Sequence, residues 1–255
     1  MRTLKLTLSY DGTDYVGWQR QDDGRSIQGE LERALAEIEG RPVTVNGAGR
    51  TDAGVHALGQ VASVRLAHRI DTDALVRALN AKLPAAIRLR RAEEAADRFH
   101  ARFGAKQKTY RYQIETGRVA DPFLSRYAWR VTDPLGLDPM RIAAESLTGE
   151  RDFAAFQAAD AGAGSTVRTV HSVIIEPQAP TSFLDTPGLT ITITGDGFLR
   201  HMVRIMVGTL VDVGSGRREA GNMARVLASR DRARAGPTAP PHGLFLVSVD
   251  YGRPR

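Results

Sequence analysis

The segment GAGRTDAGVHALGQ, Gly47–Gln60, has glycine at four of its fourteen positions, together with an arginine, an aspartate and a histidine. Glycine adopts positive φ angles and lets another chain approach closely, so this segment is suited to a loop that presents Arg50 and Asp52 outward. The residues on either side, Pro42–Val45 and Gln60–Leu66, have the composition of short strands. Glycine and aspartate also form ordinary turns, so composition alone leaves a plain turn as the alternative.

Patterns around this loop predict that strands and helices alternate along the first part of the chain. Apolar residues at every second position indicate strands, and apolar residues three or four apart indicate helices. Ser26 and Asp71 are the expected helix N-caps. The order predicts an α+β fold with a mixed or antiparallel sheet and helices on one face. The expected strands are Met1–Tyr10, Gln60–Leu66 and Ile87–Arg91, and the expected helices are Ser26–Glu39 and Thr72–Leu83.

The second part of the chain shows the same mixture of elements. Asp138 is the expected N-cap of a helix with Pro139 at its first position, and residues 157–165 have the small, polar composition of a mobile loop. The spacing of Phe153 and Phe156 in GERDFAAF favours a packing role. The expected strands are Ser125–Thr132, Thr166–Glu176, Leu189–Thr194 and Leu244–Tyr251, and the expected helices are Asp138–Leu147, one within Gly195–Gly214, and Glu219–Ala228.

Composition excludes several kinds of protein. The chain has 255 residues and no cysteine, which excludes structural disulfides, thiolate zinc sites and cysteine nucleophiles. Its beginning, MRTLKLTLSY, alternates like a strand and lacks the apolar core of a signal peptide, and no apolar run is long enough to span a membrane. A cytoplasmic protein is therefore expected.

The charge of the chain is compatible with a polyanionic partner. The formal net charge is +6, and all but four of the 35 basic residues are arginine. Such a balance suits nucleic acid. A GC-rich genome would produce the same excess of arginine, so charge alone does not identify the partner.

Two further stretches combine aromatic rings with cations. Tyr15, Trp18 and Arg20 lie in an expected loop, where rings beside arginine are able to stack on unpaired bases but more commonly anchor a loop on the core. In FHARFGAKQKTYRYQIE, Phe99–Glu115, the final part alternates as a strand and places Tyr110 among basic residues. Tyrosines on a half-buried strand usually pack inward with the hydroxyl at the rim.

The stretch GDGFLRHMVRIMVGTLVDVG, Gly195–Gly214, has apolar residues at helical spacing, which predicts a helix with one buried face. Arg200 and Arg204 are one turn apart on this helix and point in similar directions. Cations near the start of a helix face the positive end of its dipole. The position of these two arginines therefore suggests an anion nearby.

Four motifs, taken in order, resemble those of the TruA family of tRNA pseudouridine synthases. GRTDAGVHA resembles the family signature that carries the catalytic aspartate, here Asp52, and YDG…GWQ resembles its N-terminal segment. KxYRY after FHARF resembles the second motif and assigns Tyr110 to the active site. FxxHMVR resembles the motif whose basic residue pairs with that aspartate, here Arg204; Arg200 stands where many relatives have histidine and receives no catalytic role. A further stretch, GERDFAAF, is similar to the family's GxxDFxxF, and the matching stretches run from Tyr10 to Tyr251.

The resemblance implies the pseudouridine synthase fold, which consists of two similar halves around a central, positively charged cleft. The division expected for this chain is residues 1–103, which carry the aspartate loop, and residues 104–255, which carry the tyrosine and arginine motifs. The family forms homodimers, and a homodimer is expected here. No internal sequence repeat marks the two halves.

The implied reaction converts uridine to pseudouridine at positions 38, 39 and 40 of the tRNA anticodon stem-loop. The family uses neither a metal nor another cofactor, and the six histidines form no HxE or HExxH pattern. In this scheme Asp52 acts as a carboxylate, either by covalent attack or by assisting elimination, Arg204 keeps it ionised and oriented, and Tyr110 stacks on the uracil. The target nucleotide must leave its stack to be reached.

Several basic residues are candidates for contact with tRNA. Arg50 is placed to occupy the space vacated by the target nucleotide or to hold the RNA backbone. His56 is a second candidate, with a purely structural role as the alternative. The other candidates are surface arginines, for which simple solvation is an equal alternative: Arg65, Arg88, Arg90 and the arginines of Arg230–Arg234.

Three other functions are compatible with parts of the sequence. A non-catalytic RNA-binding protein of this fold is expected to have lost Asp52, Tyr110 or Arg204, and all three are present. A nucleoside hydrolase based on aspartate requires a positioned water and usually a second carboxylate or a metal, which the sequence around Asp52 does not offer. A synthase that modifies another RNA stays open.

Overall fold

Strand β1, Arg2–Tyr10, lies between two other strands of the first unit and buries its leucines on one face. Leu4, Leu6 and Leu8 have no exposed surface. β1 pairs in antiparallel fashion with β3, His56–Leu66, on one side and with β4, Ile87–Ala95, on the other. The short β2, Asn46–Gly47, pairs with β3, and β10, Leu244–Asp250, joins β3 in parallel through Phe245 and Leu246.

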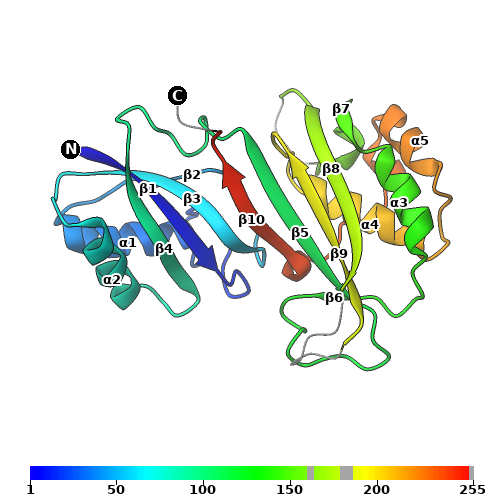
Figure 1. The fold of residues 1–255 in the computed structure, drawn as a ribbon, viewed down its shortest axis with the longest axis horizontal. Helices are drawn as coiled ribbons and strands as arrows, with labels where there is room; N and C mark the ends of the chain where they lie inside the picture. The colour runs from blue at the N-terminus through cyan, green and yellow to red at the C-terminus, as the bar shows by residue number, and fades with distance from the viewer. Residues whose placement is uncertain (160–163, 179–185, 253–255) are drawn as a thin grey trace. The chain divides into compact units, whose positions relative to one another are not determined.

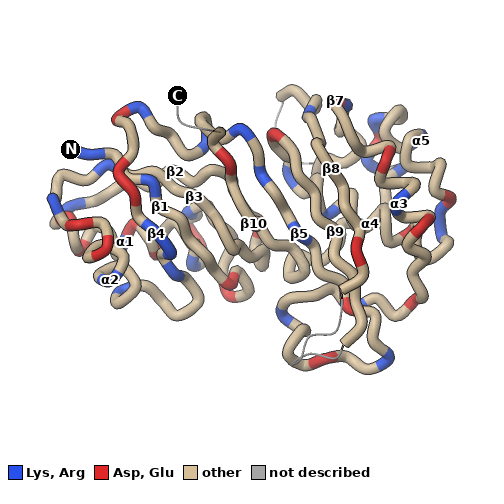
Figure 2. Tube along the Cα trace, viewed as in Figure 1, with Lys and Arg blue, Asp and Glu red and all other residues tan. Residues whose placement is uncertain are grey.

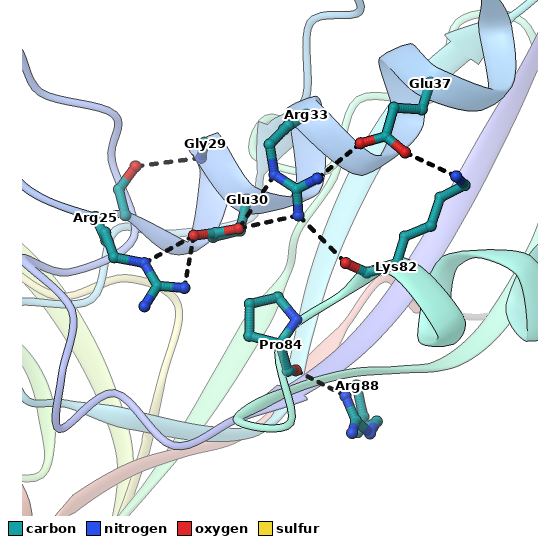
Figure 3. Close-up of polar contacts among 9 residues, drawn as sticks. Arg25, Gly29, Glu30, Arg33, Glu37, Lys82, Pro84 and Arg88 are labelled. Atoms are coloured by element: carbon teal, nitrogen blue, oxygen red, sulfur yellow. Dashed lines mark hydrogen bonds and ion pairs between the residues drawn. The ribbon is translucent and has the colours of Figure 1, made fainter.

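Two helices accompany this sheet (Figure 1). α1, Ile27–Glu39, is capped by the Ser26 side chain, and α2, Thr72–Lys82, by that of Asp71, as the sequence predicts. A chain of polar contacts joins the two helices (Figure 3). Glu37 lies 2.7 Å from both Arg33 and Lys82. These exposed pairs contribute little stability individually.

The structure is a computed structural model, and it describes residues 1–159, 164–178 and 186–252. Its contacts divide the chain into two compact units. The first unit consists of Met1–Lys106 and Phe245–Arg255, and the second of Gln107–Leu244. β10 packs with the first unit, and the functional division into residues 1–103 and 104–255 stays a prediction.

The strands of the second unit pair mainly in antiparallel fashion. β5, Gln107–Glu115, pairs with β9, Gly188–Gly195, which pairs with β8, Val167–Gln178. β7, Gly149–Asp152, adds to β8, and β6, Trp129–Arg130, pairs in parallel with the end of β5. Together with the first sheet, these strands agree with the predicted α+β class.

Three helices complete the second unit: α3, Leu137–Glu145, α4, Met202–Gly214, and α5, Asn222–Ser229. Eleven of the thirteen residues of α4 are buried, which is the pattern of a helix enclosed on all sides. Phe153 precedes a short 3₁₀ turn, Ala154–Phe156, and Phe156 is its last residue; both phenylalanines are fully buried, with ring centroids 6.2 Å apart. The predicted packing role of these phenylalanines is confirmed.

Three local predictions are wrong for identifiable reasons. Pro42–Val45 is not a strand, because the backbone of Val45 bonds to the side chains of Gln28 and Glu32 on α1. Ser125–Thr132 is a strand only at Trp129–Arg130, since the preceding residues fold into turns. α3 begins one residue before Asp138, after Gly136, whose carbonyl accepts the Met140 amide hydrogen.

The predicted mobile loop at residues 157–165 lies partly outside the described residues, as does the connection between β8 and β9. Within the ranges that the structure describes, no helix is both long and apolar enough to cross a membrane.

Candidate functional site

Asp52 lies in the first unit, in the loop between β2 and β3, and is half-buried. Its backbone carbonyl accepts a hydrogen bond from the amide of Val55 at 3.1 Å, which closes a turn. The preceding carbonyl, of Thr51, accepts from the amide of Trp18 at 3.0 Å. The loop is therefore held on both sides of the aspartate by backbone hydrogen bonds.

The YDG…GWQ segment packs directly against the loop of Asp52. Trp18 is only 2% exposed, so it anchors the loop, as the commoner interpretation of this aromatic residue predicts. Gly17 has a φ of +108°, and a Cβ added there would lie 2.6 Å from the carbonyl oxygen of Thr51. Only glycine fits at this position, because both the backbone angle and the close approach exclude a side chain.

A buried polar network supports the same loop. The hydroxyl of Tyr10 lies 2.8 Å from Thr51 Oγ1, and the amide of Gln60 donates to both Tyr10 Oη and the carbonyl of Gly49. Burial raises the pKa of Tyr10 to about 12, despite the opposing effect of its bonds with Thr51 and Gln60. Tyr10 therefore stays neutral at physiological pH and serves as a fixed brace.

The sequence does not identify Tyr10 and Gln60 as supports of the loop, although both stand at the ends of quoted motifs. Each occupies a strand position whose side chain is buried. A buried polar residue beside a candidate catalytic loop is a usable signal, because such a group must find a hydrogen-bond partner.

His56 is buried at the start of β3, with 1% of its surface exposed. Its ring stacks on Phe245, with the centroids 4.7 Å apart. Its Nδ1 lies 3.1 Å from the Gly12 amide and 3.2 Å from Asp11 Oδ1. The Gly12 amide donates to Nδ1, and both contacts hold the ring in place. These contacts give His56 a structural role, and its contact with tRNA stays a prediction.

Arg50 is exposed two residues before Asp52, and its Nε donates to Gln19 Oε1 at 3.1 Å. This bond links the aspartate loop to the GWQ segment through side chains. Arg65 is exposed near the end of β3. Both arginines are therefore accessible to a partner, and their contact with tRNA stays a prediction.

Tyr110 lies on β5 in the second unit, directly opposite Ile193 of β9. The residue is 7% exposed, and its ring meets Phe198 edge to face with the centroids 5.2 Å apart. Such aromatic pairs contribute about 0.5–1.5 kcal/mol beyond their buried area. Phe198 thus fixes the plane of the Tyr110 ring.

Arg204 is the third residue of α4, and the helix begins later than the sequence predicts. His201, the residue immediately before the helix, has a left-handed backbone with φ +62°. Residues 195–201 are not helical, so Arg200 precedes α4 and does not share a face with Arg204. The predicted pair of helical arginines is therefore wrong, but Arg204 does lie in the first turn, near the positive end of the helix dipole.

The guanidinium of Arg204 is held by the segment that we call the strap, residues 235–240. Arg204 Nε donates to the carbonyl of Ala239 at 2.8 Å, and the amide of Ala239 donates to the carbonyl of Arg204 at 3.1 Å. These two bonds fix both the backbone and the side chain of Arg204. Sequence patterns contain no signal for this contact, because the two residues are far apart in the chain.

The strap lies unusually close to α4. A Cβ at Gly208 would lie 1.9 Å from the carbonyl oxygen of Pro237, so a side chain at that position is excluded. At the next residue, Thr209 Oγ1 accepts from the amide of Gly236 at 2.9 Å and donates to the carbonyl of Ile205 at 2.8 Å. Thr209 is 1% exposed, so these bonds are formed away from water.

A carboxylate secures the far end of the strap. Asp212 is 8% exposed, and its two oxygens accept from Arg217 Nε and Arg218 Nε, each at 3.1 Å. Arg218 also donates to the carbonyls of Arg234 and Ala235. The strap is therefore held at both ends and in the middle.

Replacement of Thr209 by valine tests the strap. The change keeps the shape of the side chain but leaves the buried amide of Gly236 without its acceptor, which costs about 1–3 kcal/mol. Urea unfolding is expected to show a loss of this size, and kcat is expected to fall because Arg204 loses its fixed position. Thr209→Ser retains the hydroxyl and should stay close to wild type; equal losses in both variants would contradict the hydrogen-bond explanation.

Two other ionisable groups lie near Arg204 within the second unit. Burial raises the pKa of the Tyr112 phenol, and the Arg204 guanidinium opposes this. Burial also lowers the pKa of His242, and Arg204 lowers it further, against a hydrogen bond with the backbone of Ala128. Tyr112 donates to the carbonyl of Pro240 at 2.7 Å, which adds a further contact to the strap.

Most of the other candidate arginines have partners within the protein. Arg88 donates to the carbonyl of Pro84 (Figure 3) and to that of Ile87, and Arg90 is exposed. Arg230 contacts Asp152 at 2.9 Å, and Arg232 bonds to Gly236 and Thr238. Figure 2 shows basic and acidic residues interspersed along β4 and the helices. These arginines therefore have local structural roles, and contact with tRNA is an additional prediction.

Asp52 belongs to the first unit, and Tyr110 and Arg204 belong to the second. Their roles and the pairing of Asp52 with Arg204 stay predictions. In the part of the chain that the structure describes, no group of three or more histidine or acidic side chains is arranged to hold a metal ion.

Comparison with protein families gives one match that spans most of the chain. The family model described as tRNA pseudouridine synthase matches residues 7–104 and 143–252. These two segments include the Asp52 loop, Tyr10 and Trp18 in the first and Arg204 with the strap in the second. Tyr110 lies between the matched segments.

Several curated proteins are similar over almost their whole length. Each of the following is called tRNA pseudouridine synthase A, and each alignment covers 98% of this chain. The protein from Geobacter sulfurreducens is 47% identical over 251 residues, which is 100% of its length. Those from Myxococcus xanthus and an Exiguobacterium species are 45% and 43% identical, with 92% and 98% of their lengths covered.

Proposed function

Because this chain belongs to the tRNA pseudouridine synthase A family and is therefore an isomerase that acts on tRNA, we propose that it converts uridine to pseudouridine at positions 38, 39 and 40 of the anticodon stem-loop. Asp52 is the catalytic carboxylate. The observation that carries this proposal is the construction of the Asp52 loop, in which buried groups fix the backbone on both sides while the aspartate itself stays only half-buried.

The proposed reaction is an isomerisation, so nothing is added or removed overall. The bond between N1 of uracil and C1′ of the ribose breaks, the base turns, and a bond between C5 and C1′ forms. The hydrogen of C5 leaves to solvent and N1 gains one. Asp52 acts in the first step, either by attacking the nucleoside or by assisting elimination.

Arg204 acts on this carboxylate, and Tyr110 acts on the detached base. Arg204 pairs with Asp52 in a two-point geometry and keeps it ionised; its attachment to the strap supports this role, because a guanidinium with a fixed Nε has fewer conformations to lose. Tyr110 stacks on the uracil while it turns. The edge contact with Phe198 supports this, since it holds the ring in one orientation.

The target nucleotide leaves its stack before reaction, which costs a few kcal/mol. Arg50 then occupies the vacated space or holds the RNA backbone. The two halves of the fold form a positively charged cleft, and the enzyme works as a homodimer in the cytoplasm.

Release of tritium from tRNA labelled at C5 of uridine tests this function. Unmodified tRNA with uridine at positions 38, 39 or 40 is expected to release label, and the same tRNA with cytidine at all three positions is expected to release none. Release that persists after the replacement would mean that a different uridine is the target. Sedimentation equilibrium tests the homodimer independently.

Binding of tRNA is expected to depend strongly on salt, because the accessible candidates for contact are arginines rather than amides that read base edges. Each phosphate neutralised lowers the logarithm of the binding constant by about 0.7–0.9 for each log unit of salt. A titration of binding between low and moderate salt measures this slope. A flat dependence would contradict a phosphate-lined binding surface.

A further inference from the structure

Phe103 is a large apolar residue that is exposed on the surface of the first unit. Its relative exposure is 76%, whereas most large apolar side chains of this chain are buried. It lies in the first unit, at the tip of a single turn over residues 101–104 that precedes β5. A large exposed ring is either incidental to a loose loop or part of a binding surface, and the structure of the turn distinguishes the two.

The turn is closed by its own hydrogen bonds. His100 Nδ1 accepts from the amide of Arg102 at 3.1 Å and from that of Phe103 at 3.3 Å. The carbonyl of His100 accepts from the amide of Gly104 at 2.9 Å. The imidazole and backbone of one residue thus fix three successive amides, which leaves the Phe103 backbone little freedom.

The base of the turn is attached to the first sheet. Ala101 is fully buried, and its amide donates to Ser63 Oγ on β3 at 3.1 Å. The carbonyl of Ala101 accepts from the hydroxyl of Tyr251 at 2.8 Å, and the ring of Tyr251 packs against Phe99 with centroids 5.0 Å apart. Because the turn is fixed and its ring is exposed, Phe103 is suited to binding a partner.

A guanidinium and an imidazole lie beside this ring. The guanidinium of Arg102 lies 5.7 Å from the Phe103 ring centroid, and the imidazole of His100 lies 4.4 Å from it. His100 also lines a hollow of about 430 Å³ whose other lining residues include Arg41, Arg65 and Arg98. The surface around Phe103 is therefore aromatic at its tip and rich in arginine beside it.

Acidic residues offset only part of this charge. Glu39 lines the same hollow, but its side chain is 2% exposed, and it binds Arg41 and the amides of Ala67 and His68. Asp97 is the remaining exposed acid among the lining residues. The accessible charge is then carried mainly by arginine.

We propose that Phe103 is a stacking platform for an unpaired base of the tRNA substrate, and that Arg65, Arg98 and Arg102 neutralise the phosphates on either side of that base. We call these four residues the Phe103 surface. An exposed ring beside arginines is the combination that binds single-stranded nucleic acid. A protein partner is less well suited, because a single ring among cations gives no contiguous apolar area.

The stacked base differs from the target uridine. β3 begins at His56, close after the Asp52 loop, whereas the Phe103 turn is anchored at Ser63. Seven residues of extended strand span about 23 Å. The Phe103 surface therefore holds a second nucleotide and contributes to the placement of the tRNA rather than to the chemical step. The proposal rests on the function proposed above, because it takes tRNA as the ligand.

Binding of full-length unmodified tRNA to Phe103→Ala, Phe103→Leu and Phe103→Trp tests the proposal. Alanine and leucine both lack a π face, so both variants are expected to bind about tenfold or more weakly than wild type, while tryptophan retains the affinity. KM for tRNA should rise by the same factor in the first two. The salt dependence of binding should stay unchanged, because no cation is lost, whereas Arg102→Gln should reduce the slope by about 0.7–0.9.

The exposed Ile142→Ala on α3 serves as a control for the loss of an apolar surface residue. Wild-type affinity in Phe103→Ala would overturn the proposal. Wild-type affinity in Phe103→Leu, or conversion of a dimer to a monomer in Phe103→Ala, would also overturn it, because either result indicates an apolar protein contact. Failure of the proposed function would instead appear in the wild-type enzyme, as release of label from tRNA that lacks uridine at positions 38–40.

Discussion

Tritium release by Asp52→Asn is expected to fall to a small fraction of the wild-type rate, by about 10²–10⁴-fold or more, while the affinity for tRNA changes little. Asparagine keeps the size of the side chain but removes the charge and the ability to attack or to accept a proton. The Asp52 loop is held through backbone groups and through Thr51, not through the Asp52 carboxylate alone. The loop is therefore expected to keep its shape in the variant.

The experiment measures single-turnover release and equilibrium binding on the same preparations. Asp22→Asn, which changes an exposed aspartate in the segment before α1, is the matched control and should behave like wild type. Substantial turnover by Asp52→Asn would exclude Asp52 as the catalytic carboxylate. A parallel loss of binding would instead assign it to tRNA recognition.

Arg204→Met is expected to lose most of the activity, because the variant removes the cation proposed to keep Asp52 ionised and oriented. Methionine preserves much of the apolar stem, so α4 should stay folded. Removing the guanidinium also removes the bond to Ala239 at 2.8 Å. Part of the loss therefore arises through the strap, which the backbone bond from Ala239 continues to hold.

Arg204→Lys separates these two effects. Lysine keeps the charge but has a single terminal nitrogen, so it cannot bond to Ala239 through Nε and also present a planar pair of donors. We expect its kcat to fall less than that of Arg204→Met but to stay well below wild type. Arg225→Met, on the exposed surface of α5, controls for the loss of one positive charge. Equal activity of Arg204→Lys and wild type would show that charge alone is required.

Local patterns in the sequence predict the elements whose stability depends on near neighbours. The alternating leucines of β1, the caps Ser26 and Asp71, and the apolar run of α4 each act within a few residues, so their spacing is enough to place them. The four ordered motifs identify the family in the same way, and the comparisons confirm it. The choice of Asp52, Tyr110 and Arg204 follows from those motifs and awaits the experiments above.

Features that depend on distant partners required the tertiary structure. The burial of His56 against Phe245, the place of β10 in the first unit and the hold of the strap on Arg204 each join residues far apart in the chain. The late start of α4 and the failure of Pro42–Val45 to form a strand have the same origin, since backbone groups there bond to other segments: the carbonyl of Arg200 to the amide of Ala158, and Val45 to side chains of α1. Spacing within the sequence reports which face of an element is apolar. It does not report which distant group covers that face, and that is decided only when the strands pair and the helices pack.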